Sequence, residues 1–385
     1  MRAAINLLDL SSYADRFRML CALAAQLAEL WLLTDALPDA LRAEAAAAPG
    51  LRVVALGNDR FKRRAARWLD DRVRTGALDV VHDTFGHLAG FFQAHGADPK
   101  RRFRLVNTLY TTNRGWFDRV RPRGFDQGPS YLAQRVICLW RDARVCPMAD
   151  RTLVLGPGHE ADVMALGVPR ERIEWLPSEL DLTRFTPGDG PRSGAPLVLF
   201  TGTVWRNKGI DLLLDVLPLL QARWPGLQAH LVGNVVPWER DWLASAAAKS
   251  GLGAALHLPG KLPREALLDL YWRADVFVFP SLFEGSPRSV REAVACGCPA
   301  VVSDIPGCRG IDPDGAFLRF APPGDRPAWL DALTEALEEA PEAAAARRAC
   351  GLAHLRQHHT PAAVAARLAD LYQRLRAAPP WPATR

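Results

Sequence analysis

The sequence lacks the long apolar runs of membrane proteins: no stretch of its 385 residues approaches the roughly 18 uninterrupted apolar residues of a membrane span. The richest early run is interrupted by Glu29 and Asp35. The first residues also have no apolar signal core before a small-residue cleavage site, since Asp9 comes early. Long repeats, low-complexity tracts and heptad arrays are missing as well. We therefore expect a globular, cytoplasmic protein, and at roughly 150 residues per domain the length alone predicts two or three domains.

Paired cysteines are missing too. The chain has seven cysteines, an odd number, and none of them forms a CxxC pair, so the sequence predicts neither a disulfide framework nor a zinc site. Cys296 and Cys298 come closest, but a single intervening residue makes poor tetrahedral chelation. We expect both to be small core residues beside Gly297.

Positive charge is concentrated in one part of the chain. The net charge is +6, yet between Arg60 and Arg144 there are 18 Lys and Arg residues against 8 Asp and Glu. The segments FKRRAARW, KRRFR and RGWFDRVRPRGF interleave these cations with aromatic residues, namely Trp68, Phe103, Trp116, Phe117 and Phe125. Such a pattern fits nucleic acid, an anionic membrane surface or an anionic substrate, and equally a solvated arginine-rich face.

Short apolar runs alternate with longer helix-like stretches along the whole chain, which is typical of repeated strand-helix-strand units and parallel sheets. The Gly- and Pro-rich stretch from Thr183 to Pro196 lacks apolar periodicity and predicts an interdomain linker. The candidate strands before it are Ala4 to Leu8, Leu30 to Leu33, Arg52 to Leu56, Asp79 to His82, Arg104 to Asn107, Thr152 to Leu155 and Ile173 to Leu176.

After the linker the alternation restarts, with LVLFT, AHLVG, ALHLPG, DVFVFP and PAVVS as candidate strands. The last helical pattern opens with Thr360 as a candidate N-cap and Pro361 at the first helical position. It has one apolar stripe and no strand to complete another unit, so we expect it to cross back to the first domain. The predicted fold class is α/β, with two Rossmann-like doubly wound domains. Their predicted bounds are 1–187 and 197–359, joined by a linker at 188–196 and followed by the helix at 360–385.

The most informative segment runs from Ala274 to Gly307. A buried strand ends at Pro280, and a loop with Glu284 leads into a helix that Ser286 is expected to cap, with Pro287 at its first position. Glu284 therefore lies at the carboxyl end of a strand, where open α/β sheets place ligands. Glu292 follows about two helical turns later, on the side that can face the same place. Two carboxylates beside a helix N-terminus suit a ligand with hydroxyls and phosphate, such as a nucleotide sugar.

The segment PSLFEGSPRSVREAVACGCPAVVSDIPGCR, with Glu284 and Glu292 at this spacing, resembles the donor-binding signature of retaining glycosyltransferases of family four, the glycosyl transferases group 1. The resemblance extends through LVLFTGTVWRNKGIDLLLDVLPLL, HLVG and LHLPGKLPREALLDLYWRADVFVFPS. In the first half it is fainter and rests on VVHDTFGHLAG and LGVPRERIEWLPSELDLTRFTP. It implies the GT-B fold, in which two Rossmann-like domains face a central cleft.

The resemblance also implies roles for single residues. Glu284 corresponds to the carboxylate that holds the sugar hydroxyls, Glu292 to the one that binds both ribose hydroxyls, and Lys208 to the lysine on the pyrophosphate. The family usually has arginine directly after the glycine at Gly202; here Thr203 follows, and we expect Arg206 to supply the second cation. The loop at Lys261 and Leu262 is expected to meet the base, and the donor-binding set also includes Gly285, Ser286, Arg288 and Ser289.

The acceptor side departs more from the family. Where relatives have a Gly-Gly loop after the first strand, this chain has Ser11-Ser12-Tyr13, whose serine hydroxyls and following helix N-terminus can still meet phosphate. Tyr110 stands where a histidine is frequent. The remaining acceptor-side candidates are Ser12, His82 and His87.

The family implies transfer of a sugar from a nucleoside-diphosphate sugar to a glycan, lipid-linked or small-molecule acceptor, as in polysaccharide biosynthesis. The anomeric configuration is retained by a same-face reaction that needs no metal, so we expect no cofactor. Asp312-Pro313-Asp314 imitates a DxD metal motif but lies in a Pro-Gly turn, which is how we interpret it. The expected partners are a nucleotide-sugar donor, an acceptor that the sequence leaves open, and an anionic membrane surface at the inner face of the membrane, but no nucleic acid.

Three other functions remain open. A dinucleotide fingerprint at Gly156 to Ala161, with Glu174 further on, suggests a hydride-transfer enzyme, although it comes at the end of the first strand series. A sugar-nucleotide epimerase would use the same two-domain fold without an acceptor. A non-catalytic module that binds lipid or polyanions would use the basic surface between Arg60 and Arg144.

Overall fold

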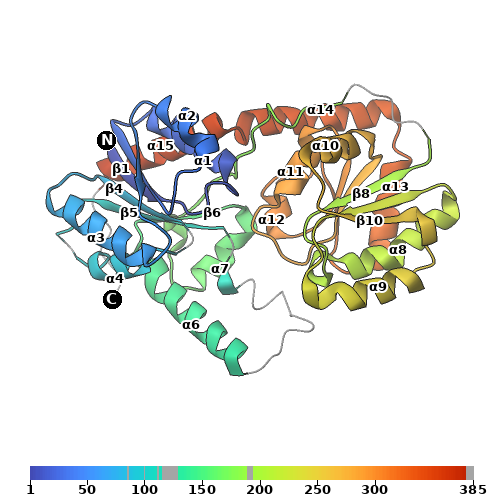
Figure 1. Cartoon of the computed structure of the whole chain (residues 1–385), viewed down its shortest axis with the longest axis horizontal. Coiled ribbons are helices and arrows are strands. Elements are labelled where there is room, and N and C mark those ends of the chain that lie inside the picture. The colour runs from blue at the N-terminus through green and yellow to red at the C-terminus, as the bar shows by residue number, and fades with distance from the viewer. Residues whose placement is uncertain (85, 99, 111, 115–128, 189–193, 379–385) are drawn as a thin grey trace. The chain divides into compact units, whose positions relative to one another are not determined.

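The computed structural model describes residues 1–378 except residues 85, 99, 111, 115–128 and 189–193. The chain folds into two compact units, each built on its own parallel sheet (Figure 1). The first unit contains Met1–Arg114, Pro129–Asp181 and the C-terminal residues from His358. The second contains Leu182–Gln357. The two sheets are separate and do not form one continuous sheet. This is what the sequence predicts, so the predicted fold class is confirmed.

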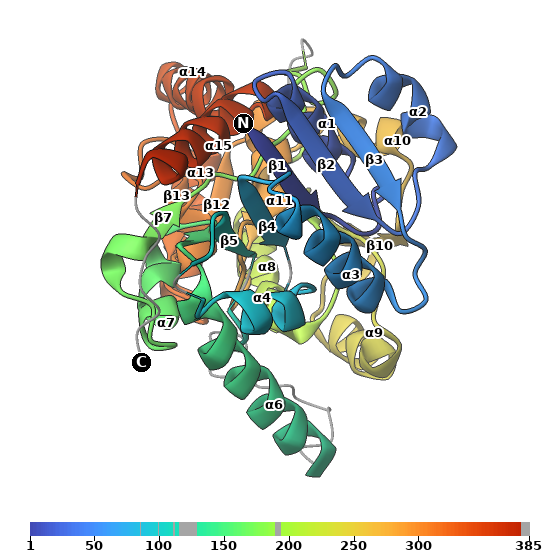
Figure 2. The same cartoon turned by 90° about the vertical axis from the view of Figure 1, so that its left-hand side faces the viewer.

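Among the described residues, the first sheet has seven strands in the order β3-β2-β1-β4-β5-β6-β7, all parallel. Figure 2 shows β3, β2, β1 and β4 side by side. Because the chain builds outward from β1 in both directions, the strand order reverses between β1 and β4. The strands are β1 Arg2–Asn6, β2 Glu29–Thr34, β3 Leu51–Ala55, β4 Val80–Thr84, β5 Arg104–Leu109, β6 Arg151–Val154 and β7 Ile173–Trp175.

Helices cover both faces of this sheet. Successive residues of a strand point to opposite faces, so Ala3 and Ile5 pack in one core with α1, whereas Ala4 packs in the other with α3 and α4. Burial on both faces explains why these strands are nearly continuous apolar runs. The helices are α1 Ala14–Ala24, α2 Asp39–Ala46, α3 Phe61–Arg74, α4 Ala89–His95, α6 Pro129–Val145 and α7 Glu160–Met164.

The last helix, α15 Pro361–Ala377, packs against α1 and belongs to the first unit although it follows the second in sequence. Thr360 caps it by accepting a hydrogen bond from the Ala363 backbone N–H at 3.2 Å. Leu368 and Tyr372 lie in the core beneath α1. The apolar stripe in this helix therefore completes the core of the first unit.

In the part of the chain that the structure describes, the second sheet has six parallel strands in the order β10-β9-β8-β11-β12-β13. Its strands are β8 Leu197–Thr201, β9 Gln228–Val232, β10 Leu256–Gly260, β11 Val276–Phe279, β12 Ala300–Ser303 and β13 Arg319–Ala321. Its helices are α8 Ile210–Arg223, α9 Arg240–Lys249, α10 Arg264–Arg273, α11 Arg288–Ala295, α12 Pro306–Arg309, α13 Arg326–Leu337 and α14 Pro341–His358. No helix in the described ranges combines the length and the apolar character that crossing a membrane requires.

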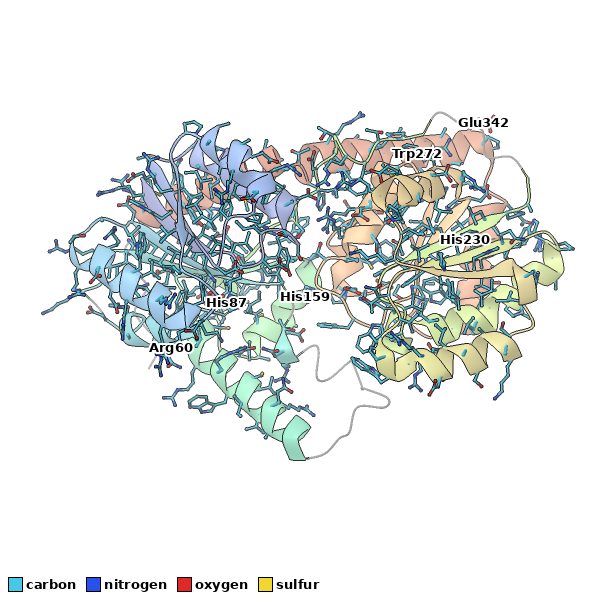
Figure 3. All side chains as sticks on the ribbon, viewed as in Figure 1. Arg60, His87, His159, His230, Trp272 and Glu342 are labelled. Atoms are coloured by element: carbon cyan, nitrogen blue, oxygen red, sulfur yellow. The ribbon has the colours of Figure 1, made fainter. Side chains whose placement is uncertain are left out.

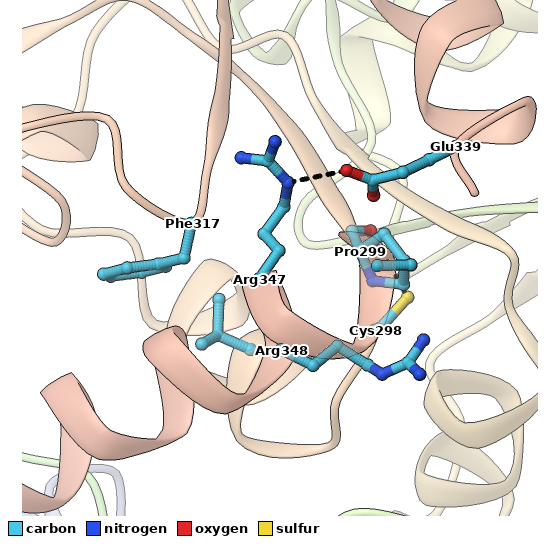
Figure 4. A pocket seen from close by; sticks show the side chains of 8 residues that line it. Cys298, Pro299, Phe317, Glu339, Arg347 and Arg348 are labelled. Carbon is cyan, nitrogen blue, oxygen red and sulfur yellow. Dashed lines mark hydrogen bonds and ion pairs between the residues drawn. The ribbon is translucent and has the colours of Figure 1, made fainter. Parts of the chain in front are cut away.

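Buried cysteines precede β12, and ion pairs join the neighbouring strand β13 to α14. Cys296 and Cys298 are buried free cysteines, which confirms their predicted place in the core. Between α13 and α14, Glu339 pairs with Arg319 at 2.7 Å and with Arg347 at 3.1 Å. Figure 4 shows Glu339 and Arg347 around a small crevice that Cys298 also lines. Through Glu339, these ion pairs connect α14 to β13.

Candidate functional site

A pocket of about 410 Å³ opens in the second unit, where the carboxyl ends of β8, β9 and β11 meet the start of α11. Its size lies in the usual range of roughly 300–1,000 Å³ for small-molecule sites. The lining residues are Thr201, Gly202, Thr203, Lys208, Val232, Gly233, Asn234, Lys261, Leu262, Leu267, Phe279, Glu284, Pro287, Arg288, Ser289 and Glu292. The structure thus brings Lys208, Glu284 and Glu292 to a single pocket.

Lys208 and Glu284 form an ion pair on the wall of this pocket. The Lys208 ammonium donates to Glu284 Oε1, and the Ser281 hydroxyl donates to the same oxygen at 3.1 Å. Both charged side chains keep some solvent contact, with exposed fractions of 21% and 16%. The carboxylate is therefore held in one position while the ammonium remains accessible from the pocket.

The backbone around this pair leaves no room for a side chain at two glycines, Gly209 and Gly307. Gly209 follows Lys208 at φ +70°, and a Cβ there would lie 2.2 Å from the Pro280 carbonyl oxygen. A Cβ on Gly307 would lie 2.5 Å from the Glu284 carbonyl oxygen. The Leu282 N–H donates to the carbonyl of Asn207 at 3.0 Å. These close approaches fix the two loops that carry Lys208 and Glu284 against each other.

Glu292 is set deeper, in the second turn of α11. Tyr271 donates a hydrogen bond to its Oε2 at 3.1 Å, and Arg288 donates to its Oε1 at 2.8 Å. The Thr201 hydroxyl lies 2.7 Å from the Tyr271 hydroxyl. Burial, and next the charge of Glu292, raise the pKa of Tyr271 well above its usual value, so this phenol stays a donor. The arrangement orients a carboxylate toward the pocket and suits it to accept hydrogen bonds from ligand hydroxyls.

Two glycines form the floor near the ends of β8 and β9. Gly202 and Gly233 have φ +147° and +145°, and a Cβ on Gly233 would lie 1.7 Å from the Gly202 carbonyl oxygen. A ligand can therefore approach the backbone closely at this point. Gly233 and Asn234 were missed by the sequence reasoning, although their position directly after the HLV strand is the signal that could have found them.

Three predicted donor residues lie elsewhere. Arg206 does not line the pocket, because its Nε donates to both oxygens of buried Glu239, at 2.9 and 3.1 Å, and its guanidinium lies over the Trp242 ring. Gly285 and Ser286 are also absent from the lining. The predicted cap at Ser286 is wrong: Pro287 occupies the N-cap position, and the Ser286 hydroxyl accepts a hydrogen bond from Arg291.

Of the acceptor-side candidates, His82 is a core residue. Its ring lies between Tyr372 and Thr108, with hydroxyl oxygens 2.6 Å from Nδ1 and from Nε2, and only 1% of the residue is exposed. Burial, and next the charge of Arg16, lower the pKa of His82 to about 3. The neutral ring is a structural group that links β4 to β5 and α15.

The other acceptor-side candidates are spread over different places. His87 lines a pocket of about 370 Å³, and Tyr110 lines another of about 190 Å³. The Arg16 guanidinium lies 5.0 Å from the centre of the Tyr110 ring. Ser12 is exposed in the turn before α1, where its N–H donates to the Asp9 carbonyl at 3.0 Å, and it lines neither pocket.

The basic and aromatic segments do not form one exposed surface, because some of their residues are buried. Arg101 is buried against Asp150 at 2.9 Å, and Phe103 is a core residue, so neither offers a surface. The segment from 115 to 128, with Trp116, Phe117 and Phe125, lies outside the described residues.

Two motifs that suggest other chemistry are accounted for by local structure. The Asp312 carboxylate accepts backbone N–H hydrogen bonds from Ala316, Phe317 and Leu318, which confirms the interpretation of this stretch as a turn. Glu174, the acid of the dinucleotide pattern, pairs with Arg151 and Arg374. The ion pair between Glu174 and Arg374 joins β7 to α15.

Comparisons with known proteins agree with this geometry. The family described as "Glycosyl transferases group 1" matches residues 195–339, which contain the whole pocket. The second domain belongs to the glycosyl transferases group 1. Among relatives, D-inositol 3-phosphate glycosyltransferase of Nocardia farcinica is 30% identical over 50% of this chain and 46% of its own length. Glycogen synthase of Mycobacterium tuberculosis is 28% identical over 78% of this chain and 66% of its own. The chain thus spans about half to two thirds of the length of these relatives.

Solved structures place the whole chain in the GT-B fold. Sucrose-phosphate synthase of Thermosynechococcus elongatus superposes with a TM-score of 0.75 at 18% identity, covering 97% of this chain and 99% of its own. HepE of Anabaena, solved in complex with UDP and glucose, gives a TM-score of 0.68 at 14% identity, covering 97% and 100%. At these identities the likeness concerns the fold. The group 1 domain and the GT-B fold agree with the family that the sequence motifs indicate.

Proposed function

We propose that this protein is a retaining glycosyltransferase that uses a nucleoside-diphosphate sugar, with a UDP-sugar as the first candidate. The observation that carries the proposal is the convergence of Lys208, Glu284 and Glu292 on a single pocket at the carboxyl ends of parallel strands. The HepE structure with bound UDP and glucose supports the choice of UDP.

In this proposal Glu292 accepts hydrogen bonds from the ribose hydroxyls, and Glu284 accepts them from the sugar. The bond between the anomeric carbon and the diphosphate oxygen breaks while the acceptor oxygen bonds to the same face of that carbon. The acceptor proton passes to the departing diphosphate. Lys208 exchanges its partner Glu284 for the diphosphate and stabilises the negative charge that develops there.

We further propose that transfer needs no metal. Lys208, Lys261 and Arg288 line the pocket, so cations of the chain itself are available to the diphosphate. Glu284 and Glu292 are already engaged by Lys208 and by Arg288. Transfer in excess EDTA should equal transfer in added Mg²⁺, and a requirement for Mg²⁺ would contradict this part of the proposal.

Peripheral membrane contact is proposed for α6. Val136, Ile137 and Trp140 have exposed fractions of 65%, 63% and 56%, and Arg144 lies over the Trp140 ring. Exposed apolar residues beside cations suit the surface of an anionic bilayer. Ile137→Ser with Trp140→Ser should reduce recovery with anionic vesicles in a flotation assay. Equal recovery of parent and variant, or equal recovery with neutral vesicles, would reject this contact.

The donor assignment is tested by binding. UDP, GDP, ADP and TDP are titrated calorimetrically into the parent, and we expect UDP to bind most tightly. Glu292→Gln keeps the shape but removes the charge that holds ribose hydroxyls, so UDP affinity should fall by roughly tenfold or more, since hydrogen bonds to charged groups contribute about 1.5–3 kcal/mol. Glu265→Ala, an exposed change in α10 outside the pocket, is the control. Unchanged UDP affinity in Glu292→Gln would reject the role of Glu292.

A further inference from the structure

The turn that carries Lys208 is attached to its surroundings on two sides. Lys208 ends a short 3₁₀ helix, Arg206–Lys208, that follows β8. On one side the Asn207 carbonyl accepts the Leu282 N–H, which ties the turn to the loop of Glu284. On the other side the Arg206 side chain reaches the loop that follows β9. This second attachment uses no residue that lines the donor pocket.

The loop after β9 runs beside the loop after β8. In Figure 3, the labelled His230 marks β9, the strand from which the first of these loops continues. The Val204 N–H donates to the Asn234 carbonyl at 2.9 Å, and Val204 forms an isolated parallel bridge with Val235. Asn234 lines the donor pocket together with Lys208. The two loops therefore contribute to the same wall of the pocket.

An ion pair joins the two loops beyond this bridge. Arg206 Nε donates to both carboxylate oxygens of Glu239, at 2.9 and 3.1 Å, and Glu239 ends a second 3₁₀ helix, Pro237–Glu239. Glu239 is only 2% exposed, and the Arg206 guanidinium lies 5.0 Å from the centre of the Trp242 ring. Charge-assisted hydrogen bonds that are shielded from water are strong and hold one geometry. The pair therefore fixes the distance between the two loops.

The position of Lys208 matters for the chemistry assigned to it. A fixed cation stabilises a developing negative charge better than a mobile one, because it needs no reorganisation while the bond breaks. The lysine side chain is long and flexible, so its placement depends on the backbone that carries it. A contact that holds this backbone can therefore affect the rate without touching the donor.

We propose that Arg206 and Glu239 are positioning residues that hold the turn of Lys208 against the loop of Gly233 and Asn234. The inference rests on the proposed function, because it requires that Lys208 stabilises the departing diphosphate. Arg206 then acts on the reaction through Glu239 and the two loops, and not as a second cation on the diphosphate.

A double-mutant cycle tests this proposal. Arg206→Met removes the charge and keeps an unbranched side chain over Trp242, and Glu239→Gln removes the charge and keeps the shape. Arg206→Met alone leaves the buried carboxylate without its cation and should destabilise the protein. The double variant leaves no buried charge without its partner, so we expect it to fold, and it is the variant that decides.

The rate is measured as hydrolysis of UDP-glucose, in which water replaces the acceptor and glucose and UDP are released. The kcat of the double variant should fall roughly tenfold or more, since small displacements caused by distant changes can cost about a hundredfold. UDP affinity, measured by calorimetry, should change much less than kcat. Each single variant should lose about as much kcat as the double variant, because all three lack the same contact.

Direct contact between Arg206 and the diphosphate predicts a different pattern. Glu239→Gln would then release Arg206, so UDP would bind at least as tightly as in the parent and kcat would not fall. Arg206→Met would weaken UDP equally with Glu239 or Gln at position 239. This pattern, or a parental kcat in the folded double variant, would overturn the proposal.

Hydrogen exchange tests the coupling of the loops without a substrate. The Lys208 N–H donates to the Trp205 carbonyl at 3.0 Å, and the Gly209 N–H donates to the Arg206 carbonyl at 2.9 Å. Both N–H groups, and that of Val204, should lose protection in the double variant. Unchanged protection at all three would contradict the coupling.

The matched control is Glu339→Gln, which breaks a buried ion pair of the same unit outside the donor pocket. The folded control should keep the parental kcat and the parental protection of both loops, so equal losses in the control and the double variant would overturn the proposal. Absence of UDP binding in the parent would reject the proposed function alone. Hydrogen exchange would then still decide whether the ion pair couples the two loops.

Discussion

His82 is the residue whose burial has the clearest measurable consequence. Its pKa is lowered from 6.5 to about 3, first by burial and then by Arg16, so the folded protein keeps the ring neutral. Below pH 6.5 the unfolded chain binds a proton that the folded chain does not, and the free energy of unfolding should fall by up to about 1.4 kcal/mol per pH unit on this account. The stability is present above pH 6.5 and is lost as the pH falls toward 3.

Denaturant unfolding between pH 7 and pH 5 checks this expectation. His82→Gln replaces the ring with an amide that does not titrate, so the variant should lose stability less steeply with falling pH than the parent. Parallel slopes for parent and variant would show that His82 does not carry the effect. From the sequence His82 and His87 looked equivalent, because neighbours such as Tyr372 are distant in sequence and only folding brings them together.

At the scale of elements, Glu339 holds α14 to β13. Burial alone would raise the pKa of Glu339, but hydrogen bonds from Arg319 and Arg347 outweigh it and lower the pKa below its usual 4.5. A carboxyl whose pKa is lowered by folding adds stability above pH 4.5 and loses it as the pH falls through the lowered value. Glu339→Gln should therefore cost about 2 kcal/mol at pH 7 and much less near pH 3. Chemical unfolding of parent and variant at both pH values checks this. An equal loss of stability at pH 7 and near pH 3 would contradict it.

The elements that sequence patterns predicted well are the long apolar strands and the helices with flanking turns. The short strand β13 was not predicted, because three residues with one fully buried position carry no recognisable period. The cap of α11 was assigned one residue too early, since the Ser286 hydroxyl accepts from Arg291, a contact that sequence spacing does not reveal. Arg206 was predicted to bind the donor because the sequence does not reveal its buried partner, Glu239, which is 33 residues away.

At the scale of the whole molecule, α15 connects the end of the chain to the first unit. Its buried face, with Leu368 and Tyr372, belongs to the same core as α1. Ending the chain after His359 should remove this face and destabilise the first unit, since each large buried apolar side chain contributes about 1.5–3 kcal/mol. Hydrogen exchange should then show loss of protection in β1 and β4 with the strands of the second unit unaffected. Unchanged protection in β1 would contradict this account.

The fold as a whole was predictable because alternating strands and helices leave few arrangements for a parallel sheet. The convergence of Glu284, Glu292 and Lys208 on one pocket was predictable as well, since all three positions follow from motif and strand position. The acceptor side was less so, because the first half departs from the family at Ser12 and Tyr110. The pocket that His87 lines became visible only once the loops after β1, β3 and β4 were placed together.

The affinity of UDP for the parent, Lys208→Ala and Glu284→Ala, measured by calorimetry, tests the central claim most directly. In the structure Glu284 is the partner of the cation that we assign to the diphosphate. Lys208→Ala should therefore weaken UDP and lower kcat on the order of a hundredfold. Glu284→Ala removes the competing carboxylate, so UDP should bind as tightly as in the parent or more tightly while sugar transfer is lost. Loss of UDP binding in a folded Glu284→Ala protein, or parental UDP affinity in Lys208→Ala, would contradict the account.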